Sequence, residues 1–185
     1  KTDSLGRYMA DNIAACFAMA HSIGIDTDII IQAILSFKNI KRRLEKRFDN
    51  TITVFDDIAH SPEKARSVLS TLKEVYDGKI IAIFEPNTGN RKIAAIPGYD
   101  DAFSSADIVI IPRLSRVKKS ADITDRTIEG QELTEIIART HNDVRFIPQD
   151  ELLISTIKDL ITKDDVVIFL GSHGFRGMIE ELENL

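Results

Sequence analysis

The stretch KIIAIFEP, residues 79–86, sets an apolar run between Lys79 and the pair Glu85 and Pro86. A short run that is apolar on both faces is typical of a strand in a parallel sheet that helices cover on both sides. Four other runs have the same texture: TITVFDDI (51–58), DIVIIPRL (107–114), VRFIP (144–148) and DVVIFLGS (165–172). Together these runs predict the strands of one sheet.

Amphipathic segments alternate with the apolar runs. They are PEKARSVLSTLKEVY (62–76), TIEGQELTEIIARTH (127–141), ELLISTIKDLIT (151–162) and FRGMIEELENL (175–185). Strands that alternate with helices form βαβ units, which place helices on both faces of a sheet. We therefore expect an α/β fold: a Rossmann-like, doubly wound, mostly parallel sheet flanked by helices.

The start of the chain has a different texture, with two helical patterns and no strand between them. Apolar residues recur at helical spacing over residues 6–23, at Ala10, Ile13, Phe17 and Ala20. Gly24 is a stop signal, and Thr27 is expected to cap a second helix over residues 28–37. The texture changes after the basic stretch KNIKRRLEKR (38–47). Its charge run KRRLEKR (41–47) is expected to be a solvated edge strand or a linker, unless Arg43 turns inward.

Composition excludes several classes of protein. With 185 residues, of which 43% are hydrophobic, the chain can form one core and an appendage. A net charge of −5 argues against a nucleic acid or an anionic membrane as partner. No apolar stretch approaches the roughly 20 residues that span a bilayer, and no signal peptide is visible, so we expect a cytoplasmic protein. The one cysteine, Cys16, excludes a disulfide framework and is expected to be buried.

The residues that end each strand are the first candidates for a site, because open parallel sheets bind ligands beyond the carboxyl ends of their strands. Polar and glycine-rich segments occupy four of these ends: 56–62, 85–92, 112–119 and 171–177. In DDIAHSP, Ser61 and Pro62 predict an N-cap and the first residue of a helix. Asp56, Asp57 and His60 are therefore expected in the strand-to-helix turn.

Two interpretations of this turn remain open. In the first, the carboxylates accept hydrogen bonds from a ribose diol and His60 contacts a nucleotide. In the second, the acids stabilise the positive end of the helix dipole and His60 only ties down the loop. The spacing is not that of a metal site, since no second histidine lies on the same turn.

The other strand ends are similarly ambiguous. The glycines of GSHGFRG allow backbone N–H groups to approach an anion, but they also suit a tight turn. Arg91 is within reach of an anionic substrate, or it belongs to a solvated loop. The remaining histidines and the lysine pair have no expected chemical role: His21, His141, Lys118 and Lys119.

Four motifs together resemble the C-terminal domain of the Mur ligases, the ATP-dependent ligases of peptidoglycan assembly. They are RRLEKR (42–47), TITVFDDIAHSP (51–62), IIAIFEP (80–86) and FLGSHGFRGMIEEL (169–182). The RRLE start, the FEP strand end and the GFRGMIEEL finish look closest to the branch that recycles murein tripeptide, UDP-N-acetylmuramate:L-alanyl-γ-D-glutamyl-meso-diaminopimelate ligase. The UDP-N-acetylmuramate:L-alanine ligase branch shares DD-x-AH-x-P and is the near rival.

The resemblance implies two parts of a larger enzyme. Residues 1–38 look like the helical tail of the family's central ATPase domain, and residues 39–185 look like the C-terminal lid that carries nucleotide and amine donor. Such a ligase uses ATP and Mg²⁺ to phosphorylate a carboxylate of a UDP-N-acetylmuramate substrate, and the amine of an amino acid or tripeptide attacks the acyl phosphate. The family's phosphate-binding loop, most Mg²⁺ ligands and UDP-sugar domain are expected before Lys1. This stretch alone is therefore expected to be inactive, and it contains no G-x-x-x-x-G-K-[ST].

By the same resemblance, residues of this chain take the family's ATP-binding positions. Asp57 matches the aspartate that binds the ribose, and Arg43 matches the arginine of R-x-E near the nucleotide. Asn12 matches the second asparagine of H-N-x-x-N, which contacts adenine. His60 matches the histidine beside the nucleotide, and Asp56 is grouped with the ATP-binding residues without a role of its own.

The substrate-binding positions follow in the same way. Arg91 falls where the family places a substrate-contacting arginine. The segment that holds the carboxylate or peptide of the incoming amine donor matches Ser172, His173, Gly174 and Phe175.

Several residues depart from the family's pattern. Tyr8 and Met9 replace the H-N pair, Ser61 stands where the two nearest branches have a second histidine, and Asn87 and Thr88 replace more basic residues. Two alternatives therefore stay open. One is a Mur-like ligase acting on another carboxylate, of the polyglutamate, cyanophycin or cofactor type; the other is a non-catalytic Rossmann-like binding module.

Overall fold

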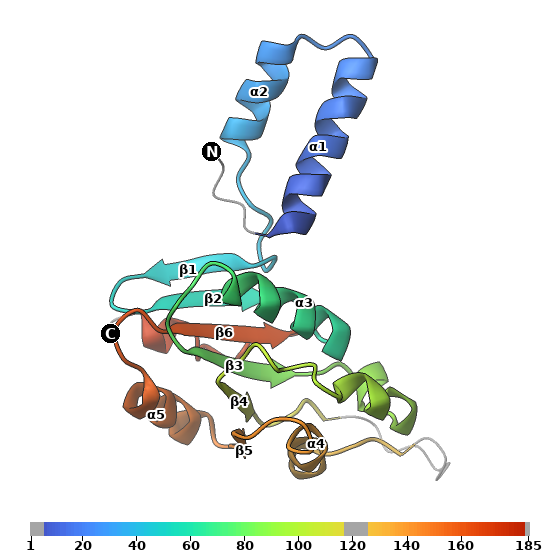
Figure 1. Ribbon diagram of the computed structural model, residues 1–185. Coiled ribbons are helices and arrows are strands. Elements are labelled where there is room, and N and C mark those ends of the chain that lie inside the picture. Colours follow the sequence, from blue (N-terminus) through green and yellow to red (C-terminus); the bar gives the residue numbers. More distant parts are fainter. Residues whose placement is uncertain (1–5, 117–125, 184–185) are drawn as a thin grey trace.

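The computed structural model describes residues 6–116 and 126–183. Figure 1 shows a sheet with the strand order β1-β2-β6-β3-β4-β5, in which β1 is antiparallel to β2 and the other neighbours are parallel. The strands are β1 (Glu45–Asp49), β2 (Thr53–Asp57), β3 (Ile80–Glu85), β4 (Ile108–Ile111), β5 (Val144–Phe146) and β6 (Val166–Gly171). The expected α/β, mostly parallel sheet flanked by helices is confirmed.

The helices lie before, between and after these strands. They are α1 (Arg7–Ser22), α2 (Thr27–Ser36), α3 (Pro62–Lys73), α4 (Gly130–Ile137) and α5 (Asp150–Leu160), with short 3-10 helices η1 (Thr88–Arg91), η2 (Ile93–Tyr99) and η4 (Glu180–Leu182). Ser61 is the N-cap of α3, as expected, and its side chain accepts a hydrogen bond from the Lys64 N–H.

Each face of the sheet carries its own core, because successive side chains of a strand point to opposite faces. Leu69 of α3 and Leu133 of α4 pack in the core on one face. Leu153 of α5 and Met178, beyond β6, pack in the core on the other. All residues of β3 and β6 are buried, which is why their sequences are apolar almost throughout.

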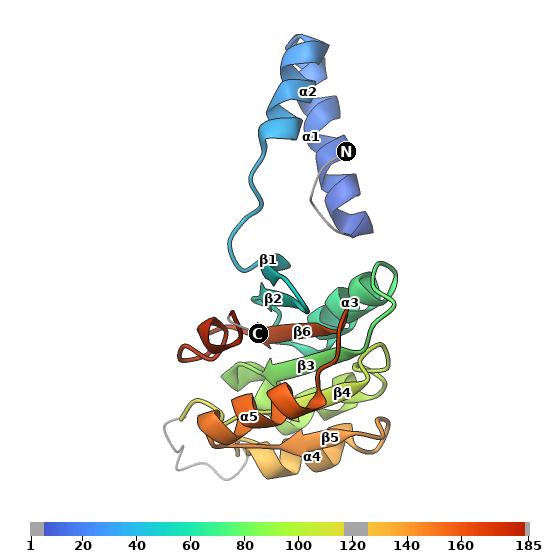
Figure 2. The ribbon, with the colours of Figure 1, turned by 90° about the vertical axis from the view of Figure 1, so that its left-hand side faces the viewer.

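The α1 and α2 helices form a pair that stands apart from the sheet, joined to it by residues 37–44 (Figure 2). Gly24 lies between the helices at a φ of 85°, a conformation that glycine adopts easily. Among the described residues of α1 and α2, only Ile30 is buried. The pair therefore presents an apolar surface that no other described element covers.

Four expectations about local structure were wrong. Cys16 is exposed, because the helix pair has no third layer to cover it. Asp26 caps α2 instead of Thr27, since its side chain accepts the Asp28 N–H at 2.9 Å. Asp56 and Asp57 end β2 and do not lie in the turn after it.

The fourth wrong expectation is the helix after GSHGFRG. Arg176 and Gly177 both have positive φ values, 52° and 86°, so the chain turns there, and up to residue 183 only the short η4 follows. The basic stretch divides into a linker and the edge strand β1, in agreement with the sequence prediction. Lys118 and Lys119 lie outside the described residues.

Candidate functional site

Asp57 lies where the linker from the helix pair meets the carboxyl end of β2. Its carboxylate accepts hydrogen bonds from the Leu44 N–H at 2.5 Å and the Ala59 N–H at 2.7 Å, and the residue is only 4% exposed. Burial raises the pKa of Asp57, and the two N–H donors act in the opposite direction. Asp57 therefore holds the linker against the turn that follows β2.

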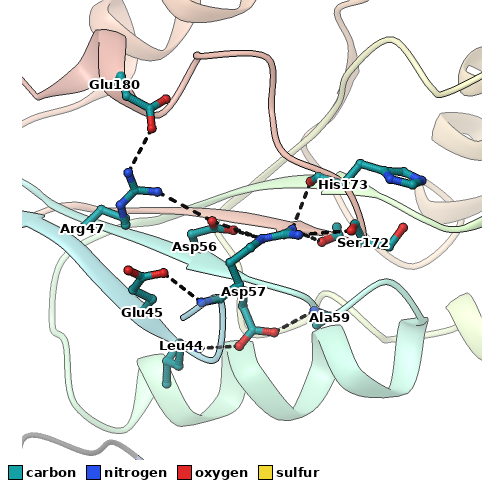
Figure 3. A network of polar contacts seen from close by, with 11 residues as sticks. Leu44, Glu45, Arg47, Asp56, Asp57, Ala59, Ser172, His173 and Glu180 are labelled. Atoms are coloured by element: carbon teal, nitrogen blue, oxygen red, sulfur yellow. Dashed lines mark hydrogen bonds and ion pairs between the residues drawn. The ribbon is translucent and has the colours of Figure 1, made fainter. Parts of the chain in front are cut away.

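Asp56 points the other way and meets arginines. Its carboxylate lies 3.3 Å from Nε of Arg42 and 3.7 Å from Nη1 of Arg47, which also pairs with Glu180 at 2.9 Å. Burial raises the pKa of Asp56, and the positive charge of Arg42 opposes this shift. Figure 3 shows Asp56 and Arg47 beside the loop that follows β6.

Arg42 connects this carboxylate to the segment Gly171–His173. Its guanidinium donates to three successive carbonyl oxygens: Gly171 at 2.5 Å, Ser172 at 3.1 Å and His173 at 3.0 Å. The inward-turning arginine of RRLE is thus Arg42.

Arg43 faces a groove of about 630 Å³ that runs between α1 and α2. Most of the groove is apolar, and its polar lining residues include Tyr8, Asn12 and Arg43. Burial raises the pKa of Tyr8, the nearby charge of Asp57 adds to the shift, and Arg43 opposes it. The Tyr8 phenol is therefore close to both the Asp57 carboxylate and the Arg43 guanidinium.

His60 lies in the turn after β2, as expected. Its Nδ1 is 2.7 Å from the Ile58 carbonyl oxygen, and its own carbonyl accepts the Asn87 N–H at 3.4 Å. The latter hydrogen bond joins the segments that follow β2 and β3, the two strands that flank β6 in the sheet. The Nδ1 contact leaves Nε2 as the ring nitrogen available to a ligand.

Arg91 is 2% exposed and sits under the loop after β3. Its guanidinium donates to the carbonyls of Ile128 at 2.9 Å and Ser115 at 2.7 Å, and to Glu129 at 3.1 Å. In this arrangement Arg91 ties together three segments of the chain, and it is not part of a solvated loop.

Glu85 ends β3 beneath the same loop. Its Oε1 accepts the Ser115 N–H at 2.8 Å and the Ser115 hydroxyl at 2.6 Å. Its Oε2 is buried and lies 3.7 Å from Nη1 of Arg176. Arg176 also makes a bidentate contact with Asp150, at 2.7 and 2.8 Å.

The segment 171–177 combines an anchored part with an open part. Phe175 is buried and packs edge-on against Phe169, with ring centroids 5.0 Å apart. Apart from Gly174 and its two chain neighbours, no atom of the described residues lies within 4 Å of the position that a Cβ would take at Gly174, and His173 is exposed. A ligand can therefore approach the backbone at Gly174 directly.

Tyr8, Asn12 and Arg43 line the groove, and Asp57 lies close to Tyr8 and Arg43. Arg42 joins the carbonyls of residues 171–173 to the linker. The ATP- and substrate-binding roles expected for these residues remain predictions. Arg42 and Arg176 were not predicted, although both stand inside motifs. The carbonyls that Arg42 contacts are about 130 positions away along the chain, and the Asp150 partner of Arg176 is 26 positions away, so the sequence pattern does not reveal these contacts.

No group of three or more histidine, cysteine or acidic residues within 6–116 and 126–183 is arranged to hold a metal ion. Within the same ranges, no helix has both the length and the apolar character needed to cross a membrane.

A mostly parallel sheet with charged residues gathered at the carboxyl ends of its strands defines the class of doubly wound, ligand-binding α/β domains. Comparison with known families gives a more specific assignment, because residues 42–173 match the pattern described as Mur ligase, glutamate ligase domain. The chain belongs to this family.

Relatives in the family carry ligase names. The chain is 31% identical to UDP-N-acetylmuramate–L-alanine ligase of Crocosphaera subtropica, covering 97% of this chain and 35% of that protein. It is 30% identical to the enzyme of the same name from Brachyspira hyodysenteriae, covering 91% of this chain and 36% of that protein. The chain thus spans about a third of the length of these relatives.

Solved structures share the fold. A UDP-N-acetylmuramate–alanine ligase from Thermotoga maritima superposes with a TM-score of 0.77 at 24% identity, over 97% of this chain and 38% of that one. A murein peptide ligase from Psychrobacter arcticus superposes with a TM-score of 0.65 at 23% identity, over 98% of this chain and 37% of that one. Both relatives above are alanine ligases, so the expectation that the tripeptide branch is closest is not confirmed.

Proposed function

We propose that this chain is the C-terminal part of an ATP-dependent ligase that joins an amino acid or peptide to a UDP-N-acetylmuramate substrate through an acyl phosphate. The observation that carries the proposal is the junction where Asp57, Arg43 and Tyr8 converge beside the groove. A carboxylate, a guanidinium and an apolar wall are the groups that a ribose, a phosphate chain and a purine ring require.

The residues at this junction fit a nucleotide. The Asn12 amide offers both a donor and an acceptor to the adenine edge, and Arg43 offers a positive charge to phosphate. Asp57 uses one lone pair on each oxygen for the Leu44 and Ala59 N–H groups. Because each carboxylate oxygen has a second lone pair, Asp57 still has acceptors for ribose hydroxyls.

ATP with Mg²⁺ supplies the phosphoryl group that activates the carboxylate. The described residues then bind and orient the substrates. They also exclude water, which protects an acyl phosphate from hydrolysis. The open backbone at Gly174, with Ser172 and His173 beside it, is the proposed contact for the incoming amine donor, and Phe175 anchors this segment in the core. Arg91 supports the neighbouring loop from below.

Residues 1–38 are proposed to be the tail of a preceding ATPase domain, and residues 39–185 the lid that closes on it. The support is the exposed apolar surface of the helix pair, which includes Ile29, Leu35 and Phe37 at 62%, 53% and 51% exposure. Exposed apolar surface of this extent is typical of interaction surfaces, which supports the proposal that a preceding domain covers it. The proposed enzyme acts in the cytoplasm.

The amine donor is the finer part of the proposal. The names of the curated relatives favour L-alanine, whereas the FEP and GFRGMIEEL motifs favour murein tripeptide. A second candidate function is a Mur-like ligase for another carboxylate. It is favoured by Asn87, whose side chain accepts the Asn90 N–H at 3.1 Å where more basic residues were expected.

Substitution of Asp57 in the full-length protein tests the nucleotide site. Asp57→Asn is expected to raise the KM for ATP about tenfold or more, because a charge-assisted hydrogen bond contributes about 1.5–3 kcal/mol. The matched control is Asp165→Asn. Asp165 is 2% exposed and also accepts two backbone N–H groups, from Lys79 at 2.9 Å and Thr162 at 2.8 Å, before the amino end of β6.

Both variants are expected to lose stability, but only Asp57→Asn is expected to change the KM for ATP. Equal KM values in the two variants would show that Asp57 has only a structural role. A panel of UDP-sugar acids and amine donors, assayed by ADP release, then identifies the reaction. Absence of turnover with every UDP-N-acetylmuramate acid would leave the second candidate.

A further inference from the structure

Arg42 makes a set of contacts that no other described arginine makes. Its guanidinium donates to the carbonyls of Gly171, Ser172 and His173, and its Nε lies 3.3 Å from both oxygens of Asp56. The three carbonyls are consecutive and about 130 positions away along the chain. Figure 3 shows Ser172 and His173 beside Asp56 at this point.

The backbone of Arg42 is fixed as well. Its N–H donates to Glu45 at 2.8 Å, and its carbonyl accepts the Ile58 N–H at 2.9 Å. Arg42 and Leu44 have φ values of 57° and 47°, a left-handed conformation that residues with a side chain adopt only when their surroundings hold them. Arg42 therefore joins the linker, the turn after β2 and the loop after β6.

The carbonyl contacts are not needed to neutralise Asp56. Arg47 already lies 3.7 Å from the same carboxylate and makes none of the carbonyl contacts. Three carbonyls and a carboxylate around one planar guanidinium require the forked donors of arginine, which a lysine ammonium does not reproduce. The arrangement thus specifies an arginine, and its geometry orders the loop.

We propose that Arg42 is a positioning residue: it ties the loop Gly171–Gly174 to the linker 37–44, so that the linker and this loop move as one unit. What the loop binds rests on the proposed function, but the tie itself does not. A change in the direction of the linker beneath the helix pair is thereby passed to the open backbone at Gly174. Asp57 is attached to the same linker, because its carboxylate accepts the Leu44 N–H.

The test compares Arg42→Lys with Arg47→Lys. Both arginines contact Asp56, and their side chains are similarly exposed, 26% and 28%, so the two variants keep the charge and differ in the carbonyl contacts. Hydrogen exchange is measured on this chain for the peptide that covers 172–178, where the Met178 N–H donates to the Phe175 carbonyl at 2.9 Å. Arg42→Lys is expected to accelerate exchange there about tenfold, and Arg47→Lys less than about threefold.

The kinetic readout uses the full-length protein. Arg42→Lys is expected to raise the KM for the amine donor about tenfold while the KM for ATP changes less than about threefold. Arg42→Gln, which removes the charge, is a second variant and is expected to accelerate exchange in the same peptide. Thermal unfolding of each variant shows that the fold is retained.

The outcomes separate the two proposals. Equal exchange in Arg42→Lys and Arg47→Lys would overturn the tie. Faster exchange with an unchanged KM for the amine donor would overturn the positioning role. If the wild-type protein shows no ATP-dependent ligase activity, the proposed function fails, and the exchange experiment still decides whether Arg42 holds the loop.

Discussion

At the scale of single residues, Asp150 shows how one carboxylate can hold two elements together. It lies at the start of α5 and pairs with Arg176 at 2.7 Å and with Arg113 at 3.1 Å. The hydrogen bond from Arg176 is the main cause that holds the pKa of Asp150 below its ordinary value of 3.8. The folded state therefore favours the ionised form.

The sign of the pH effect follows from this direction. A carboxyl group whose pKa is lowered on folding contributes stability above its unfolded pKa, and that contribution is lost as the pH falls through the lowered folded value. Asp150→Asn is therefore expected to be less stable than wild type at neutral pH, and the difference is expected to shrink as the pH falls below the ordinary carboxyl pKa of about 4. Urea denaturation of both proteins at several pH values measures this difference in the free energy of unfolding.

A control uses the partner. In an Arg176→Gln background the same Asp150→Asn change should have a smaller effect with a weaker dependence on pH, because the main partner is absent. A difference between wild type and Asp150→Asn that is the same at pH 7 as at the acid end would contradict this account.

The pKa values of Asp56 and Asp57 are shifted in the opposite direction to that of Asp150, since burial raises both. Their contribution to stability is present below the unfolded pKa and is lost as the pH rises through the folded value. The sequence placed both acids in the turn after the strand, whereas they are the last two residues of β2. It did not distinguish their partners, because those partners come from a linker and a loop that only the folded chain brings together.

At the scale of elements, the end of β6 offers a matched pair of glycines. A Cβ at Gly171 would lie 2.9 Å from Cζ of Phe175 and 3.2 Å from the Glu85 carbonyl oxygen, whereas a Cβ at Gly174 would meet no atom within 4 Å. Gly171→Ala is therefore expected to cost about 1–3 kcal/mol through overpacking. Gly174→Ala should stay within about 0.5 kcal/mol of wild type.

Chemical denaturation of the two variants tests this difference. If they are equally stable, Phe175 does not pack against β6 as described. A stable Gly174→Ala variant that loses activity in the full-length protein would also support the proposed ligand contact at Gly174, because only its open face has changed.

The elements themselves were predictable to different degrees. The apolar runs identified β2, β3, β4 and β6, since strands buried on both faces must be apolar, and the run VRFIP identified the half-buried edge strand β5. The failure beyond Gly171 has a physical reason: the left-handed conformations of Arg176 and Gly177 prevent a helix, and a side-chain pattern does not report backbone angles. Cys16 was misjudged because helical periodicity does not show whether a covering layer is present.

At the scale of the whole molecule, the helix pair and the sheet domain are expected to be energetically independent. Neither core contains a side chain from α1 or α2. Removal of residues 1–36 should therefore change the free energy of unfolding by less than about 1 kcal/mol, and it should reduce binding of the dye ANS, since the apolar groove is lost.

Leu69→Ala is the positive control, because it shows how large a loss of unfolding free energy is when a core side chain is removed. Leu69 is 0% exposed in the core beneath α3, and its truncation is expected to cost about 2–5 kcal/mol. Unfolding of the sheet domain on removal of residues 1–36 would show that the two parts fold together.

The place of β6 in the sheet has a consequence for synthesis of the protein. It is the last of the described strands along the chain, yet it lies between β2 and β3 and is hydrogen-bonded to both. Until the ribosome has released it, β1 and β2 form one half-sheet and β3, β4 and β5 another, with no ladder between them. At about 5–20 residues per second, the nascent chain exposes two apolar strand edges for several seconds. A premature stop before Val166 would leave those edges unpaired, which makes the truncated chain a substrate for chaperones and proteases.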